Sequence, residues 1–261
     1  MRQWGGTLIQ AIDRAARVLT SLQGARHLGI AELAAALELP PSTVHGIVKS
    51  LQGHGLVAKE PNGNRYMLGP ALLKLSNVYL DTLDVRARSL RWTAELARRT
   101  GLATRLGVEL FDEVIIIHHD ERPDGTEQMP ETGLSIPAHA SALGKVLLAY
   151  DGALAETVLG DGELRALTGD TVTSAKALTR QFAQIRERGL AEELDEAVLG
   201  EASVAAPIAD RSGAVVAALS VVLPSSDWPA ADAVQNALRE TARNISRELG
   251  ATRWPPLQSG E

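Results

Sequence analysis

The chain has 261 residues, 45% of them hydrophobic, with a net charge of -6 and no cysteine. This length allows two domains that each bury a core, and the absence of cysteine excludes disulfides and thiolate metal sites. No apolar run approaches the ~20 residues needed to cross a bilayer, and the first ten residues lack the pattern of a signal peptide. We therefore expect a cytoplasmic protein without membrane contact.

The charge is divided unevenly along the chain. Residues 1–70 contain seven Lys or Arg and four Asp or Glu, a net charge of +3, whereas the remaining residues carry a net charge of -9. A mildly basic segment attached to an acidic body is typical of a DNA-binding module joined to a sensor domain.

The first predicted element is a helix over residues 7–22, which we expect Gly24 to end. Residues 28–57 then predict two short amphipathic helices separated by a turn. Pro40 and Pro41 prevent the first helix from continuing, and Pro41 or Ser42 suits the start of the second. This is a helix-turn-helix pattern, whose second helix carries polar residues outside its apolar stripe: Ser42, Thr43, His45 and Lys49. We expect these residues to face a duplex.

A β-hairpin is predicted directly after these helices. Residues 56–59 and 65–68 read as strands, and Pro61-Asn62-Gly63-Asn64 supplies residues that tolerate positive φ. Three helices followed by a hairpin form a winged helix-turn-helix domain, here residues 1–69, with the hairpin tip from Asn62 to Arg65 beside the DNA.

A linker helix is predicted over residues 70–83, followed by an effector-binding domain over residues 84–254 and a frayed tail over residues 255–261. We expect Asp84 to cap the helix that opens this domain and Gly101 to end it. Further strands are predicted at 103–110, 113–119, 134–138, 190–193, 202–209 and 214–223, and helices at 140–150, 174–188 and 230–249. The expected class is α+β, in which the second domain has α/β character and a mixed or antiparallel sheet.

Four features in this order resemble IclR-type bacterial transcriptional regulators: the winged domain, IPAHASALGK at 136–145, IRERGL at 185–190 and VAAPIAD at 204–210. Residues 83–92, LDVRARSLRW, and the LGKVL sequence at 143–147 are similar to the actinobacterial glycerol-operon regulators of that family. The resemblance covers nearly the whole chain.

The resemblance implies a homodimer or dimer of dimers that binds double-stranded operator DNA and a small organic effector, more often as a repressor than as an activator. We expect no cofactor. The effector contacts that it implies are the backbone amides of Ala142 and Leu143, with Glu193, Ser203 and Ser220. Some members that bind small keto acids have a second serine where this chain has Val222, which favours a larger or less polar effector here.

The DNA contacts predicted for Ser42, Thr43 and Arg65 have alternative roles. Ser42 and Thr43 can hold a phosphate at the helix N-terminus or simply cap the helix. We expect His45 to reach a base edge and Lys49 to contact phosphate. Because this helix has one Lys and no Arg, we expect Arg65 to supply the cation that enters a groove; its alternative is a solvated hairpin charge.

Three other patterns are weaker. Gly144-Lys145 lacks the glycine spacing and the Ser or Thr of a phosphate-binding loop. His118 and His119 are adjacent in a strand, so they point to opposite faces and do not suit one metal ion. His139 lies near Ser141, but no serine has a nucleophile-elbow pattern.

We therefore expect a ligand-responsive transcriptional regulator of a catabolic operon, for glycerol or a related carbon source, with no catalytic and no metal-binding residues. The alternative is a metabolite-binding enzyme with an appended regulatory DNA-binding domain.

Overall fold

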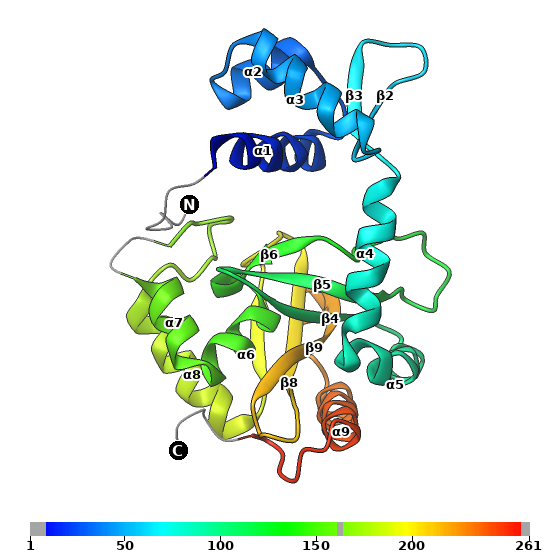
Figure 1. Cartoon of the computed structure of the whole chain (residues 1–261). Helices are drawn as coiled ribbons and strands as arrows, with labels where there is room; N and C mark the ends of the chain where they lie inside the picture. Colours follow the sequence, from blue (N-terminus) through cyan, green and yellow to red (C-terminus); the bar gives the residue numbers. More distant parts are fainter. Residues whose placement is uncertain (1–8, 161–163, 257–261) are drawn as a thin grey trace. The chain divides into compact units, whose positions relative to one another are not determined.

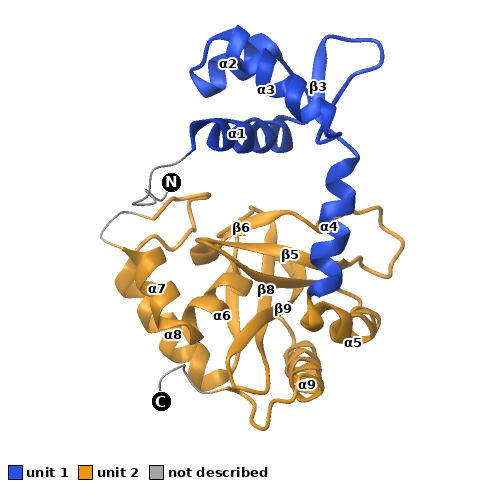
Figure 2. Cartoon of the chain, viewed as in Figure 1, with its two compact units in different colours: residues 1–82 blue, residues 83–261 orange. Residues whose placement is uncertain are grey.

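The computed structural model describes residues 9–160 and 164–256 and divides the chain into two compact units, residues 1–82 and 83–261 (Figures 1 and 2). After the roles that the sequence predicts for them, we call them the DNA-binding unit and the effector unit. The division falls after Thr82, so the predicted linker helix belongs to the first unit. No described helix is long and apolar enough to span a bilayer.

The DNA-binding unit is a winged helix-turn-helix, as the sequence predicts. Its helices are α1 (Gln10–Ala25), α2 (Ile30–Leu37), α3 (Pro41–Gly53) and α4 (Ala71–Thr82), and its strands are β1 (Leu28–Gly29), β2 (Val57–Lys59) and β3 (Arg65–Leu68). The strands form an antiparallel sheet in the order β1-β3-β2. Buried side chains such as Val18, Leu33 and Val44 bring α1, α2 and α3 together in one core.

The end of α1 differs from the prediction. Gly24 lies within the helix, and the chain leaves it at Arg26, which adopts φ 64° and donates its N–H to the Leu22 carbonyl at 3.0 Å. Arg26 is the central residue of a γ-turn, because the His27 N–H bonds the Ala25 carbonyl at 2.8 Å, and this conformation is rare and strained. The predicted start at Thr7 lies outside the described residues.

The effector unit is built on a six-stranded antiparallel sheet in the order β6-β5-β4-β9-β8-β7. Its strands are β4 (Ala103–Leu110), β5 (Glu113–Asp120), β6 (Ser135–Pro137), β7 (Ala191–Leu194), β8 (Glu201–Ala209) and β9 (Val215–Pro224). Its helices are α5 (Asp84–Thr100), α6 (Ala142–Tyr150), α7 (Gly152–Leu159), α8 (Ala175–Arg188) and α9 (Asp232–Glu248), with short 3-10 helices η1 (Ala138–Ala140) and η2 (Ser225–Asp227).

Helices cover both faces of this sheet. On one face, Leu143 and Val146 of α6 share a core with Ala205 and Ala218 of the sheet, and α8 packs beside α6. On the other face α5 packs beside α9, whose Ser246 Oγ accepts the Ala209 N–H at 3.1 Å (Figure 1). We call the face under α6 the effector face, because the predicted effector residues lie there.

Two helix starts and one connection differ from the prediction. Asp84 is the first residue of α5 and not its cap, because Leu83 occupies that position. The 3-10 helix η1 delays α6 to Ala142, with Ser141 as its cap. The stretch expected to be irregular between α6 and α8 contains α7, whose first turn is stabilised by a bond from the Leu154 N–H to the Asp151 carboxylate. The predicted end of α5 at Gly101 is confirmed, with φ 70°.

The predicted frayed tail begins too early. Trp254 Nε1 donates to the Pro207 carbonyl of β8 at 2.9 Å, and its ring lies against Gly189, the residue that ends α8. Pro255 also lies against Gly189, and Pro256 is buried. Residues 257–261 lie outside the described residues.

Candidate DNA-binding surface and effector site

The outer face of α3 carries the residues expected to contact DNA. Val44, Val48 and Leu51 are buried in the core, whereas Ser42, His45 and Lys49 are exposed. The apolar stripe therefore fixes which side of the helix points outward. The structure brings the exposed residues together on one side of the helix that the motif predicts to read DNA.

The first turn of α3 leaves its polar groups available. Pro40 is the N-cap residue and makes no side-chain cap, so neither Ser42 nor Thr43 has the capping role considered as an alternative. Thr43 N–H bonds the Pro40 carbonyl at 3.0 Å, and both hydroxyls make no hydrogen bond within the described part of the chain. Hydroxyls and a helix N-terminus together suit a phosphate.

Asn62 lies in the turn of the wing, whereas Arg65 lies in one of its strands. Asn62 is exposed in the turn, whereas Arg65 is the first residue of β3, opposite Gly29, so it does not lie at the tip. Its side chain is 52% exposed, and its Nη2 is 2.6 Å from Glu32 Oε1, a partner that the sequence reasoning did not foresee. The Gly29 N–H and then Arg65 hold the pKa of Glu32 below its usual range. This pair with Glu32 competes with a DNA contact through Nη2 of Arg65.

The effector face brings the four predicted sheet residues together. Glu193 of β7 lies opposite Ser203 of β8, which lies opposite Val222 of β9. Ser220 is two residues from Val222 on the same strand, so its side chain lies on the same face. These residues form a continuous patch across three adjacent strands.

Glu193 is the most perturbed group of this patch. It is 3% exposed, and its two oxygens accept the Ser203 hydroxyl at 3.1 Å and the Glu196 N–H at 3.2 Å. Burial raises the pKa of Glu193 to about 7, although these two bonds act in the opposite direction. The carboxyl group can therefore change its charge near neutral pH.

The predicted backbone donors open α6. Ser141 caps the helix by accepting the Gly144 N–H at 3.1 Å, and Ala142 and Leu143 are the first two helical residues. Within the described chain, the N–H groups of Ala142 and Leu143 have no partner, as is usual for the first helical turn. They suit an oxygen atom of a ligand.

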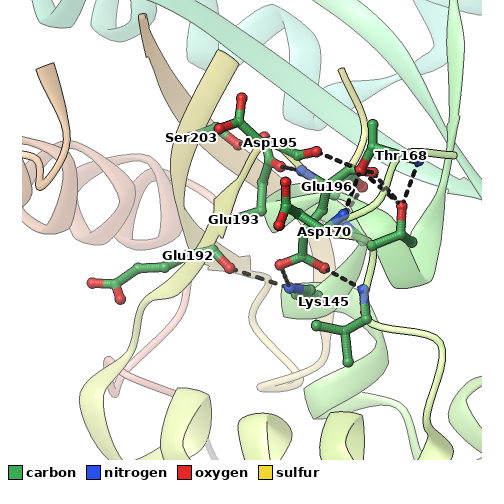
Figure 3. Close-up of polar contacts among 12 residues, drawn as sticks. Lys145, Thr168, Asp170, Glu192, Glu193, Asp195, Glu196 and Ser203 are labelled. Carbon is green, nitrogen blue, oxygen red and sulfur yellow. Dashed lines mark hydrogen bonds and ion pairs between the residues drawn. The ribbon is translucent and has the colours of Figure 1, made fainter. Parts of the chain in front are cut away.

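Lys145 links α6 to the strand that carries Glu193 (Figure 3). The side chain is fully buried, pairs with the Glu196 carboxylate and bonds the Glu192 carbonyl at 3.4 Å. Glu196 also accepts the Val172 N–H at 3.2 Å. Gly144 lies against backbone, since an added Cβ would be 2.2 Å from the Ala138 carbonyl oxygen. The Gly-Lys pair thus has a packing and ion-pair role.

The sequence reasoning missed Arg105, which lies on β4 opposite Ser220. Arg105 is 8% exposed, and its guanidinium binds two carboxylates: Nη2 is 2.8 Å from Glu131, and Nη1 is 2.6 Å from Glu201. Burial acts to lower the pKa of Arg105, but the bonds to both carboxylates raise it above its ordinary value. A cation inside the mostly apolar strand 103–110 was the available signal; its partners, far away in sequence, were not predictable.

The weaker patterns have structural explanations. His118 pairs with Asp120 at 3.1 Å, while His119 lies opposite Arg105, so the two rings face opposite sides of the sheet as predicted. Among the described residues no group of three or more potential ligands could hold a metal ion. His139 bonds the Arg165 carbonyl at 2.9 Å, and Ser141 caps α6.

A winged helix-turn-helix joined to an α/β unit with a buried polar patch defines the class of ligand-responsive DNA-binding regulators. Comparison with known proteins supports this class. Residues 11–61 match the IclR helix-turn-helix domain, and residues 77–247 match the C-terminal domain of bacterial IclR transcriptional regulators. The chain belongs to the IclR family of transcriptional regulators.

The relatives match almost end to end. The glycerol operon regulatory proteins of Streptomyces griseus and Streptomyces coelicolor are 43% and 39% identical over 251 residues, which cover 94% of this chain and 98% of each relative. The crystal structure of an IclR transcriptional regulator from Alicyclobacillus acidocaldarius is 29% identical, with a TM-score of 0.79, and the match covers 92% of this chain and 98% of that one.

Proposed function

We propose that this protein represses an operon for the catabolism of glycerol or a related hydroxyl-rich compound, and that a small molecule bound at the effector face changes its affinity for the operator. The observation that carries the proposal is the patch of Glu193, Ser203 and Ser220 near unpaired N–H groups of α6. The Glu193 carboxylate can accept from ligand hydroxyl groups, and the Ser220 hydroxyl and the N–H groups can donate to ligand oxygens. The Ser203 hydroxyl already donates to Glu193, so it can accept from the ligand. The names of the Streptomyces relatives support the choice of operon.

The DNA-binding unit supplies the other half of the proposal. Ser42, Thr43 and Lys49 contact phosphates, His45 reaches a base edge, and Asn62 lies beside the backbone of the duplex. Arg65 joins them when DNA phosphate replaces Glu32 as its partner. Exposure of these side chains supports the assignment, with Thr43 only partly exposed.

We infer a homodimer, or a dimer of dimers, from exposed apolar side chains of the DNA-binding unit. Ile12 of α1 is 65% exposed, and Leu73, Leu75 and Val78 of α4 are exposed to similar extents. No residue of α4 is buried, although the helix is amphipathic. A second copy of the chain would cover these side chains. The α3 helix of that copy would then read the second half of a palindromic operator.

The alternative of an enzyme with a regulatory domain has weaker support. Its best candidates, His139 and Ser141, are engaged with backbone groups. The relatives named above are transcriptional regulators. We therefore propose a binding role, without catalysis, for the effector unit.

Two measurements test the proposal. The full-length protein should bind the DNA upstream of its own gene at least about 1,000-fold more tightly than a random duplex at physiological salt. Equal affinity for both duplexes would refute the regulatory function.

A thermal-shift series with glycerol, glycerol phosphates, sugar acids and aromatic acids tests the effector site. A true effector raises the midpoint temperature of thermal unfolding of the parent protein, and it changes the affinity of the parent for the operator. The Ser203→Ala and Ser220→Ala variants should lose that shift, whereas Ser226→Ala, in η2, should retain it. An effector whose shift survives in both site variants would place the binding site elsewhere.

A further inference from the structure

Gly46 lies in the middle of α3 without a reason in the fold. It is the sixth of thirteen residues in the helix and is exposed, and a Cβ added there would have no atom within 4 Å. Glycine destabilises a helix interior relative to alanine, because its backbone loses more freedom on folding. The isolated chain gains no packing advantage from this residue.

Other glycines show what a structural reason looks like. A Cβ at Gly69 would be 2.1 Å from the Gly55 carbonyl oxygen, and one at Gly107 would be 2.4 Å from a Val114 methyl group. Gly55 itself adopts φ 70°. Gly46 has neither a close neighbour nor a positive φ, and it shares this with Gly24 of α1, so only its place on α3 can link it to a partner outside the chain.

The position of Gly46 identifies that partner. Ser42, His45, Gly46 and Lys49 are spaced i, i+3, i+4 and i+7, so they form one stripe along the exposed side of α3. Gly46 is flanked on this stripe by the residues assigned to phosphate and base contacts. The stripe carries one cation and no arginine, so the common bidentate contact of arginine with guanine is not available to it.

We propose that Gly46 determines operator specificity by letting the backbone of α3 approach the base edges of the major groove more closely than any side chain would allow. The bare helix surface then reads the shape of the groove floor, and His45 beside it reaches deeper into the groove. This inference rests on the proposed binding of DNA through α3.

The test uses full-length Gly46→Ala with Gly24→Ala as its matched control. Gly24 is also a helical, exposed glycine with no atom within 4 Å of an added Cβ, but it lies in α1. Both variants should unfold at the same temperature as the parent or a few degrees higher. Gly46→Ala should bind the operator at least about tenfold more weakly, with unchanged affinity for random duplex and an unchanged salt dependence.

Three results would overturn the inference. An operator affinity of Gly46→Ala within about twofold of the parent would show that DNA does not approach the α3 backbone closely at Gly46. Equal losses on operator and random duplex would assign Gly46 to general docking. A parent protein without preference for its operator would remove the proposed function as well, so the two failures are distinguishable. Selection from a randomised duplex pool gives a second readout: Gly46→Ala should select different bases from the parent and from Gly24→Ala.

Discussion

The stripe on α3 and the effector face hold their polar groups in opposite ways. Ser42, His45 and Lys49 are exposed and make no hydrogen bond within the described residues. Glu193 and Lys145 are buried and bonded to several partners. A duplex brings a large charged surface of its own, so side chains need only be presented to it. Buried polar groups need partners, so the small-molecule site proposed at the effector face must have its hydrogen bonds arranged before binding.

The largest effect should come from breaking the buried ion pair. Lys145→Met leaves Glu196 as an uncompensated buried charge, and we expect the free energy of unfolding of the effector unit to fall by about 3–5 kcal/mol. Urea unfolding followed by tryptophan fluorescence measures this loss. The double variant Lys145→Met/Glu196→Gln removes the charge and keeps an acceptor for Val172, so it should recover most of the stability. A loss below about 1 kcal/mol in the single variant would contradict a buried charge pair.

The second effect concerns pH. The pKa of Glu193 is raised from 4.5 to about 7, so the folded protein retains a proton that the unfolded chain releases between these values. The free energy of unfolding therefore falls as pH rises from about 4.5 to 7 and then levels off. Glu193→Gln should lack this fall and be more stable than the parent by about 2 kcal/mol at pH 8, after the loss of one hydrogen bond is deducted.

Chemical unfolding of both proteins across pH 4–9 measures that difference. Parallel stability curves for parent and Glu193→Gln would show that folding does not raise the pKa of Glu193. In that case the effector face would resemble the α3 stripe, in that folding would not perturb the pKa of its ionisable group.

A smaller effect should follow from removing the cation of α3. Lys49→Ala should weaken binding to all duplexes alike and reduce the slope of log affinity against log salt by about 1, because one phosphate contact is lost. Its stability should stay unchanged, since Lys49 is exposed. Lys176→Ala in α8, also an exposed cation, is the control and should keep the parent slope. An unchanged slope for Lys49→Ala would remove Lys49 from the phosphate contacts.

The smallest effect concerns Arg65. Glu32→Gln keeps an acceptor for the Gly29 N–H but removes the charge that holds Arg65, so we expect operator affinity to rise by roughly two- to fivefold. Fluorescence anisotropy at low salt measures the gain. The double variant Glu32→Gln/Arg65→Ala should show none of it. A gain that persists without Arg65 would reflect only the lower negative charge of the unit.

The sequence predicts elements with strong local signals. The apolar spacing and paired prolines of α2 and α3 located the helix-turn-helix, and Asn62-Gly63 located the wing. Gly101 marked a helix end, because it adopts the left-handed conformation in the structure. Resemblance to a family, and not spacing, brought Glu193, Ser203 and Ser220 together as candidates, and the strand register places them on one face.

Features that depend on distant residues were not predictable. The partners of Arg105 lie 26 and 96 residues away, so no local pattern connects them. The partner of Arg65 lies 33 residues away on α2, which is why the wing cation was expected to be free. Helix α7 was missed because its eight residues follow α6 after a single residue, Asp151, which caps it.

The anchoring of Trp254 sets how far the chain can be shortened. A version ending at Leu249 would leave the Pro207 carbonyl of β8 without its indole donor and would expose the side of Gly189 to water. A version ending after Pro256 would keep both contacts. Residues 254–256 thus connect the end of α8 to β8, an inner strand of the sheet. We expect an affinity tag added after Pro256 to leave these contacts in place.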